Sequence, residues 1–116
     1  MGLLYSYHIE FQTAKLKKDC ETPLRAQRRW GEEGGRTVAR RLDQVRAAEC
    51  LGDLGPEPPF RRHKLIGRRR GQYALDLIKG LRLVLQPLTH EGQPDMTSEP
   101  SSITRVRIME VTDYHD

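Results

Sequence analysis

Three side chains that can exchange or orient a proton stand next to one another late in the sequence: Asp113, Tyr114 and His115. An imidazole titrates near neutral pH and can act as a general acid or base, and a neighbouring carboxylate can orient the ring. On their own, these residues also fit a solvated polar tail that has no catalytic role. They become informative only together with a second group of residues.

That second group is basic. Residues 59–82 hold eight basic side chains and one acidic one, a net charge of +7, although the whole chain carries only +4. Guanidinium groups match phosphate oxygens in a planar fork, so the stretch favours a polyanionic partner, with a merely solvated face as the alternative. The candidates are His63, Lys64, Arg68, Arg69, Arg70 and Arg82.

These residue types fit cleavage of RNA without a cofactor. The reaction needs a base for the 2′-hydroxyl, cations for the phosphate as it gains charge, and an acid for the leaving 5′-oxygen. A metal-dependent nuclease would need several converging carboxylates, and the strand-like segments supply only Asp76, Glu110 and Asp113. Cys20 and Cys50 lack the spacing of a zinc site. We therefore expect neither a metal nor a cofactor.

The elements that position these residues follow from periodicity. Apolar and polar side chains alternate along several segments, as they do in strands with one wet face. The predicted strands are residues 3–11, 60–66, 72–78, 81–86 and 103–111.

Helical spacing predicts a short helix over residues 13–21, a second over 23–30 that the following glycines weaken, and the best-defined helix over 36–49. Residues 51–59 are rich in proline and glycine and predict a turn. Residues 87–102 predict an exposed, mobile loop.

Helices followed by strands indicate an α+β fold, with a mostly antiparallel sheet of four to five strands and two to three helices packed on one face. The length of 116 residues fits one domain spanning 1–116. No apolar stretch approaches the roughly 18 residues of a membrane helix, so no membrane is expected. Two widely spaced cysteines favour the reducing cytoplasm.

The basic segment after His63 and the run Asp113-Tyr114-His115 occur together in a known family. The sequence resembles the HigB-type toxins of the RelE/ParE superfamily over residues 63–75, 81–85 and 110–115, and residues 26–31 and 46–49 are similar as well. The likeness covers nearly the whole chain apart from the loop at residues 87–102.

The resemblance implies a RelE-like fold and a toxin of a type II toxin–antitoxin system. Such a toxin is an endoribonuclease, an mRNA interferase that inhibits translation by cutting mRNA on the translating 70S ribosome. Its implied partner is a cognate HigA-like antitoxin, and it would meet DNA only indirectly, through the antitoxin complex.

The resemblance also implies a set of catalytic residues: His63, Arg82, Asp113, Tyr114 and His115. In this interpretation His115 first, and His63 second, transfer protons, and Asp113 orients an imidazole. Arg82 and Arg70 bind the scissile phosphate, and Tyr114 stacks on the substrate or forms a hydrogen bond to it.

The remaining basic residues would bind RNA phosphates: Lys64, Arg68, Arg69 and Arg70. One position departs from the family pattern, because Ile66 stands where a lysine often follows the histidine by three residues. Lys64 or Arg70 is the expected substitute.

Two alternatives remain open at the level of sequence. A toxin of the same fold can act without cleaving RNA, as the gyrase-inhibiting ParE branch does. The arginines could also belong to an RNA-binding module without catalysis, whose affinity would fall steeply with salt.

Overall fold

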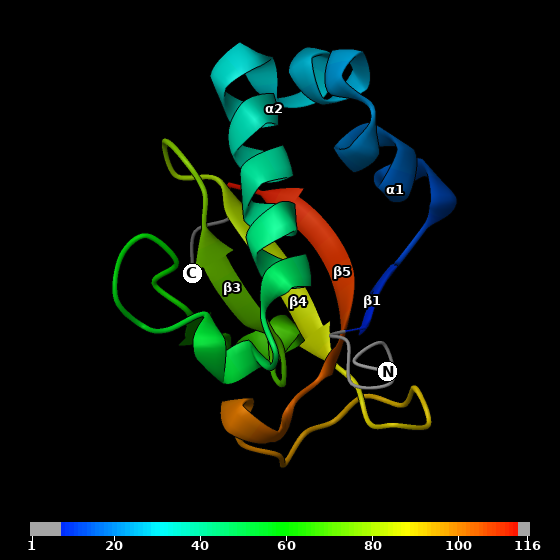
Figure 1. Cartoon of the computed structure of the whole chain (residues 1–116), viewed down its shortest axis with the longest axis vertical. Coiled ribbons are helices and arrows are strands. Elements are labelled where there is room, and N and C mark those ends of the chain that lie inside the picture. Colours follow the sequence, from blue (N-terminus) through cyan, green and yellow to red (C-terminus); the bar gives the residue numbers. More distant parts are fainter. Residues whose placement is uncertain (1–7, 114–116) are drawn as a thin grey trace.

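A computed structural model of the chain describes residues 8–113. It has an α+β architecture in which a five-stranded sheet is crossed on one face by a long helix (Figure 1). In sequence order the strands are β1 (His8–Phe11), β2 (His63–Lys64), β3 (Tyr73–Asp76), β4 (Arg82–Pro87) and β5 (Arg105–Thr112).

The sheet order is β1-β5-β4-β3-β2. The four strands from β2 to β5 are antiparallel to their neighbours, whereas β1 joins the edge of β5 in parallel. The predicted α+β class and mostly antiparallel sheet are thus confirmed, and the parallel edge strand makes the sheet mixed.

The helical region consists of α1 (Ala14–Glu21) and α2 (Pro23–Ala47). Thr13 caps α1, and its Oγ1 accepts a hydrogen bond from the backbone N–H of Leu16 at 3.0 Å. α2 begins at a proline, which suits a first helical turn, and it breaks at Gly31, where φ is 81° and ψ is 169°. We call residues 23–30 the first arm of α2 and residues 32–47 its second arm.

Only the second arm crosses the sheet. Its Val38, Leu42 and Val45 are fully or almost fully buried and join the main core with the side chains of β3, β4 and β5. The first arm and α1 lie beyond one end of the sheet (Figure 1), and α1 contributes Cys20 to the margin of the same core. The expected packing of all helices on one face is therefore only partly right.

The connections differ from expectation in two places. The strand predicted over residues 60–66 shrinks to His63–Lys64, because Arg61 adopts a left-handed φ of 46° that interrupts extended backbone. The loop at residues 87–102 is mostly exposed, but it folds back on itself through a bridge between Leu88 and Pro94. No helix within residues 8–113 is long and apolar enough to cross a membrane.

Candidate functional site

The sheet face opposite the second arm carries the residues of interest. Tyr73 and Leu75 of β3 point into the main core, so Ala74 and Asp76 point the other way. On β4, Leu83 and Leu85 enter the core, which sends Arg82 and Val84 to that same opposite side. We call this side the second face.

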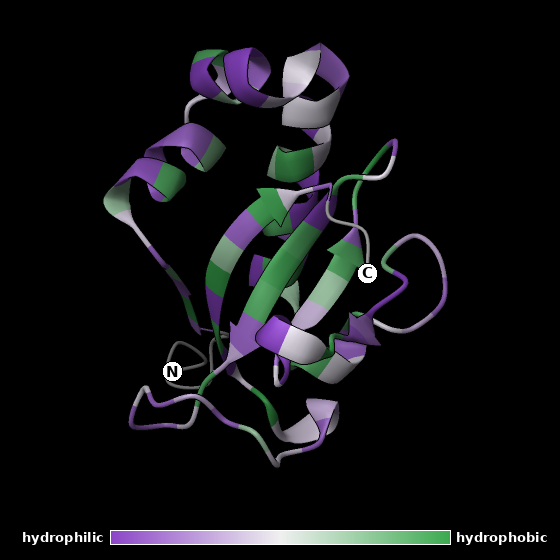
Figure 2. Ribbon diagram, turned by 180° about the vertical axis from the view of Figure 1, so that it is seen from behind, coloured by the Kyte–Doolittle hydropathy of each residue, from purple (hydrophilic) through white to green (hydrophobic). Residues whose placement is uncertain are grey.

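Cross-strand register adds residues to the second face, because directly paired residues share a side of the sheet. His63 pairs with Ala74, Glu110 with Val84, and Thr112 with Arg82. A small apolar cluster of Leu65, Ala74, Val84 and Met109 lies beneath these polar groups. Figure 2 shows that no α-helix covers this face.

His63 is exposed on the edge strand β2, and its ring is oriented by the backbone. Its Nδ1 lies 2.9 Å from the carbonyl oxygen of Arg61. A carbonyl oxygen can only accept, so Nδ1 donates its proton and Nε2 of the neutral ring keeps a free lone pair. His63 is therefore arranged to accept a proton through Nε2.

Arg82 lies on the same face, and Asp76 of the neighbouring strand holds it. Its Nε is 3.1 Å from Oδ1 of Asp76, whose Oδ2 is 3.4 Å from Nε of Arg61. The Arg82 side chain is 31% exposed, so the guanidinium is accessible although its charge is balanced. The role of Asp76 was not predicted from the sequence. One feature pointed to it, because Asp76 is the only acidic residue among the basic residues 59–82.

The positions of His63 and Arg82 are separated by two strand spacings and two residues along the strands. With about 4.8 Å per strand and about 3.4 Å per residue, their Cα atoms are about 12 Å apart. Both side chains are therefore long enough to contact a single phosphodiester group placed between them.

The other expected catalytic residues follow β5. Thr112 pairs directly with Arg82, and Asp113, which is exposed, comes immediately after it. The chain thus leaves the sheet beside Arg82. Tyr114 and His115 lie outside the described residues.

The basic turn after β2 is a short 3-10 helix, Gly67–Arg69, that lies against the second face (Figure 2). Nε of Arg69 is 3.1 Å from Oε2 of Glu110, and this half-buried pair ties the turn to β5. Arg69 thus has a structural contact that sequence alone did not indicate.

The remaining cations of this region differ from Arg69. Lys64, Arg68 and Arg70 are exposed, and their side chains make no hydrogen bond or ion pair with any residue from 8 to 113. Ile66, between Lys64 and Arg68, is 72% exposed. The second face therefore has paired arginines near its centre. Lys64, Arg68 and Arg70 lie at the β2 edge of the sheet, where Lys64 pairs with the core-facing Tyr73 and so starts from the side opposite the second face.

A cavity of about 500 Å³ opens beside these free cations. It is lined by Lys64, Leu65, Arg70, Gly71, Tyr73, Asp95, Met96 and Ser98. This cavity was not predicted from the sequence, because one of its walls comes from the loop at residues 87–102, which contains no recognisable chemical motif. Within residues 8–113, no group of three or more His, Cys, Asp or Glu side chains is placed to hold a metal ion.

The second face thus combines an oriented imidazole with a partly exposed guanidinium, and cations without partners among residues 8–113 lie at its β2 edge. Comparison of the chain with protein family profiles, curated proteins and solved structures gave no match.

Proposed function

We propose that this chain is a HigB-type toxin with a RelE-like fold, a metal-independent endoribonuclease that cuts mRNA on the translating 70S ribosome. The observation that carries the proposal is the presence of His63 and Arg82 on one sheet face that no α-helix of residues 8–113 covers, beside cations of the β2 edge that have no partner within the same residues. These residues supply the base and the cations that phosphodiester cleavage by the 2′-hydroxyl requires, and His115 would supply the acid.

The proposed reaction is a transesterification. Nε2 of His63 takes the proton of the 2′-hydroxyl, and the 2′-oxygen forms a bond to the adjacent phosphorus while the bond to the 5′-oxygen breaks. The products are a 2′,3′-cyclic phosphate and a 5′-hydroxyl, and His115 supplies the proton that the leaving oxygen takes up. Asp113 orients that imidazole, and Tyr114 stacks on a base.

Arg82 stabilises the charge that develops on the phosphate. Its Nε is engaged by Asp76, but its Nη2 has no hydrogen-bond partner among residues 8–113. A guanidinium has five N–H donors in a fixed plane, so one edge can remain on Asp76 while the other meets the phosphate. Asp76 thereby fixes the direction of the free donors.

A second candidate function is RNA binding without cleavage. It is favoured by the pairing of Arg82 with Asp76 and of Arg69 with Glu110, together with the apolar Ile66 at a position where the family often has lysine. Each of these lowers the positive charge available to a transition state. A protein that only binds RNA would keep its affinity without either histidine.

The biological setting is part of the proposal. A HigA-like antitoxin would neutralise the toxin in the cytoplasm, and the pair would contact DNA only through the antitoxin. The free cations Lys64, Arg68 and Arg70 would hold message or ribosomal RNA phosphates.

The test is induced expression in bacteria of the wild type and of single histidine variants, with growth curves and mapping of new 5′ ends in cellular mRNA. His63→Ala and His115→Ala should lose growth arrest and cleavage, because removal of a general acid or base lowers the rate by about 10²- to 10⁴-fold. His90→Ala is the matched control, since His90 is an exposed histidine on the loop at residues 87–102.

Cleavage inside translated regions that survives His90→Ala and is lost in the other two variants would support the proposal. Arrest without new 5′ ends would indicate the gyrase-inhibiting class. RNA binding without arrest from all four proteins would indicate the binding module.

A further inference from the structure

We propose that the cavity at the β2 edge binds one unpaired nucleotide of single-stranded RNA, with its phosphate on Lys64 and Arg70 and its base against Met96. This inference rests on the proposed function, because it names a substrate subsite beside the proposed catalytic face. The cavity volume of about 500 Å³ lies within the usual range for small-molecule sites, about 300–1,000 Å³.

One end of the cavity is cationic. Lys64 comes from β2 and Arg70 from the end of the basic turn, and both are exposed without side-chain partners among residues 8–113. Two neighbouring cations that form no ion pair with a carboxylate of residues 8–113 suit a phosphate. They differ in this from Arg69 and Arg82, which are paired.

The other part of the lining is apolar. Leu65 and Tyr73 are 4% and 5% exposed and give the cavity an apolar floor, while Met96, also in the lining, is 54% exposed. A thioether side chain is polarizable and makes favourable contacts with aromatic rings. An exposed methionine in a cavity with an apolar floor is therefore suited to one face of a base.

The position of Met96 depends on Gly71. Gly71 has a φ of +90°, and a side chain added there would overlap the sulfur of Met96. The missing Cβ thus lets the loop at residues 87–102 approach the basic turn and close the cavity. This close approach joins two segments that the sequence separates by about 25 residues.

The loop wall is held in place by Asp95. Its Oδ1 accepts hydrogen bonds from the backbone N–H groups of Ser98 at 2.9 Å and Thr97 at 3.1 Å, and its own N–H donates to the carbonyl oxygen of Pro87 at 2.9 Å. The hydrogen bonds from Ser98 lower the pKa of the Asp95 carboxyl group, so it stays negative. Asp95 lines the same cavity as Lys64 and Arg70, and its negative charge repels phosphate, so a bound phosphate would contact the two cations and avoid this carboxylate.

The cavity borders the proposed catalytic face, because its lining includes Leu65, which belongs to the apolar cluster of that face. His63 lies two residues before Leu65 on the same edge of the sheet. A nucleotide bound in the cavity would place the adjacent phosphodiester near the imidazole. The cavity would therefore contribute to the choice of cleavage site as well as to affinity.

The test is titration of protein carrying ¹³C-methyl methionine with a 2′-O-methyl RNA hexamer, which has no 2′-hydroxyl to attack, and with adenosine 5′-monophosphate. The Met96 methyl signal should move upfield as a base stacks on it, while the Met109 signal should stay in place. Ribose 5-phosphate, which lacks a base, should leave both signals unmoved. Met96→Ala assigns the signal.

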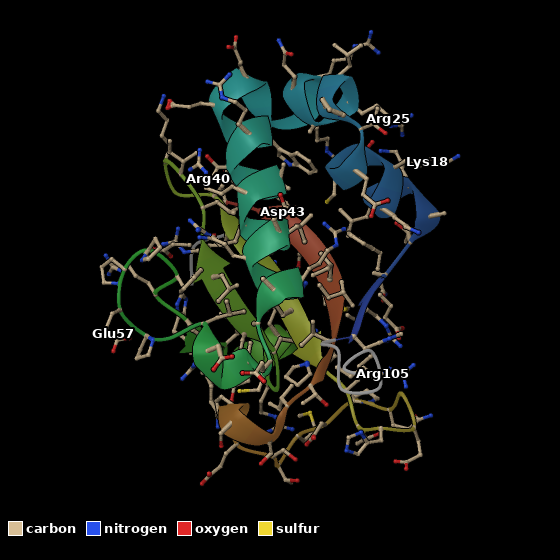
Figure 3. The ribbon with its side chains drawn as sticks, in the orientation of Figure 1. Lys18, Arg25, Arg40, Asp43, Glu57 and Arg105 are labelled. Carbon is tan, nitrogen blue, oxygen red and sulfur yellow. The ribbon has the colours of Figure 1, made fainter. Side chains whose placement is uncertain are left out.

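Affinity for the hexamer gives the second measurement. Met96→Ala should bind about tenfold more weakly, the value of roughly one stacked base, and Leu24→Ala, which removes another exposed apolar side chain, should not. Arg70→Ala should bind more weakly and with a smaller salt dependence. Its control is Lys18→Ala, on α1 near the opposite edge of the sheet (Figure 3).

A Met96 signal that moves no more than the Met109 signal at saturating hexamer would overturn the subsite. If the wild-type protein nevertheless cleaves mRNA in cells, the proposed function stands and only the nucleotide subsite is refuted. Conversely, a shifted Met96 signal in a protein that cleaves nothing would support the subsite and refute the nuclease.

Discussion

Replacement of Gly31 by alanine distinguishes a broken α2 from a continuous one. Gly31 has φ 81° and ψ 169°, a combination that is essentially restricted to glycine. A Cβ at this position would meet nothing within 4 Å. The substitution therefore changes the backbone energy without creating a side-chain clash.

The expected magnitude follows from that geometry. Holding an alanine in such a conformation costs of the order of 1–3 kcal/mol, whereas glycine to alanine inside a continuous exposed helix would stabilise the protein by about 1 kcal/mol. The two descriptions of α2 thus predict opposite signs. For a chain of this length, about 4 °C per kcal/mol converts the expected loss into a Tm lower by about 4–12 °C.

The assay is thermal unfolding, which gives Tm, together with urea unfolding, both followed by the fluorescence of Trp30, the only tryptophan, and by circular dichroism. Arg28→Ala serves as the control, because Arg28 is an exposed first-arm residue with no side-chain partner within residues 8–113, and it should change the unfolding free energy by less than about 0.5 kcal/mol. A higher urea midpoint in Gly31→Ala would refute the break, and with it the separate placement of the two arms.

Three further predictions concern individual side chains. Burial raises the pKa of the Glu10 carboxyl group, but the hydrogen bonds and charges of two β5 arginines bring it below its ordinary value. Its contribution to stability should therefore be complete above about pH 5 and decline as the pH falls, and Glu10→Gln should flatten the acid side of a plot of urea midpoint against pH. Burial raises the pKa of the Cys20 thiol to about 12, so a thiol reagent should label Cys50 in the folded protein and Cys20 only in urea. Arg41→Met should lower the unfolding free energy by about 1–3 kcal/mol, because the buried Arg41 donates to the carbonyl oxygen of Asp76 at 2.9 Å and that acceptor would lose its partner.

Local patterns predicted the local structure well. The short helix predicted over residues 13–21 and the alternation along β3 and β4 depend on neighbours in sequence. The position of the break in α2 depends instead on packing between segments. Gly31, Gly34 and Gly35 are equally weak helix formers, and packing decides among them, since a Cβ at Gly35 would lie 3.0 Å from the backbone of the first arm.

The residue types of the candidate site could be predicted from the sequence, whereas the ion pairs between these residues could not. Sequence placed His63 and Arg82 on strands, and the register then put them on one face. The Asp76–Arg82 and Arg69–Glu110 ion pairs depend on cross-strand positions and on the path of the basic turn, which no local pattern encodes. The cavity wall at Met96 depends on a loop whose sequence shows only turn residues.

The parallel pairing of β1 with β5 has a consequence for the nascent chain. Glu10 of β1 and Arg107 of β5 are 97 residues apart in sequence, so at about 5–20 residues per second a ribosome needs about 5–20 s to deliver the partner of the first strand. Until then Ile9 and Phe11, which later pack against the main core, have no sheet to join. The second face gains its β5 residues in the same final step, so a partly synthesised chain lacks both a closed core and the strand that pairs with Arg82.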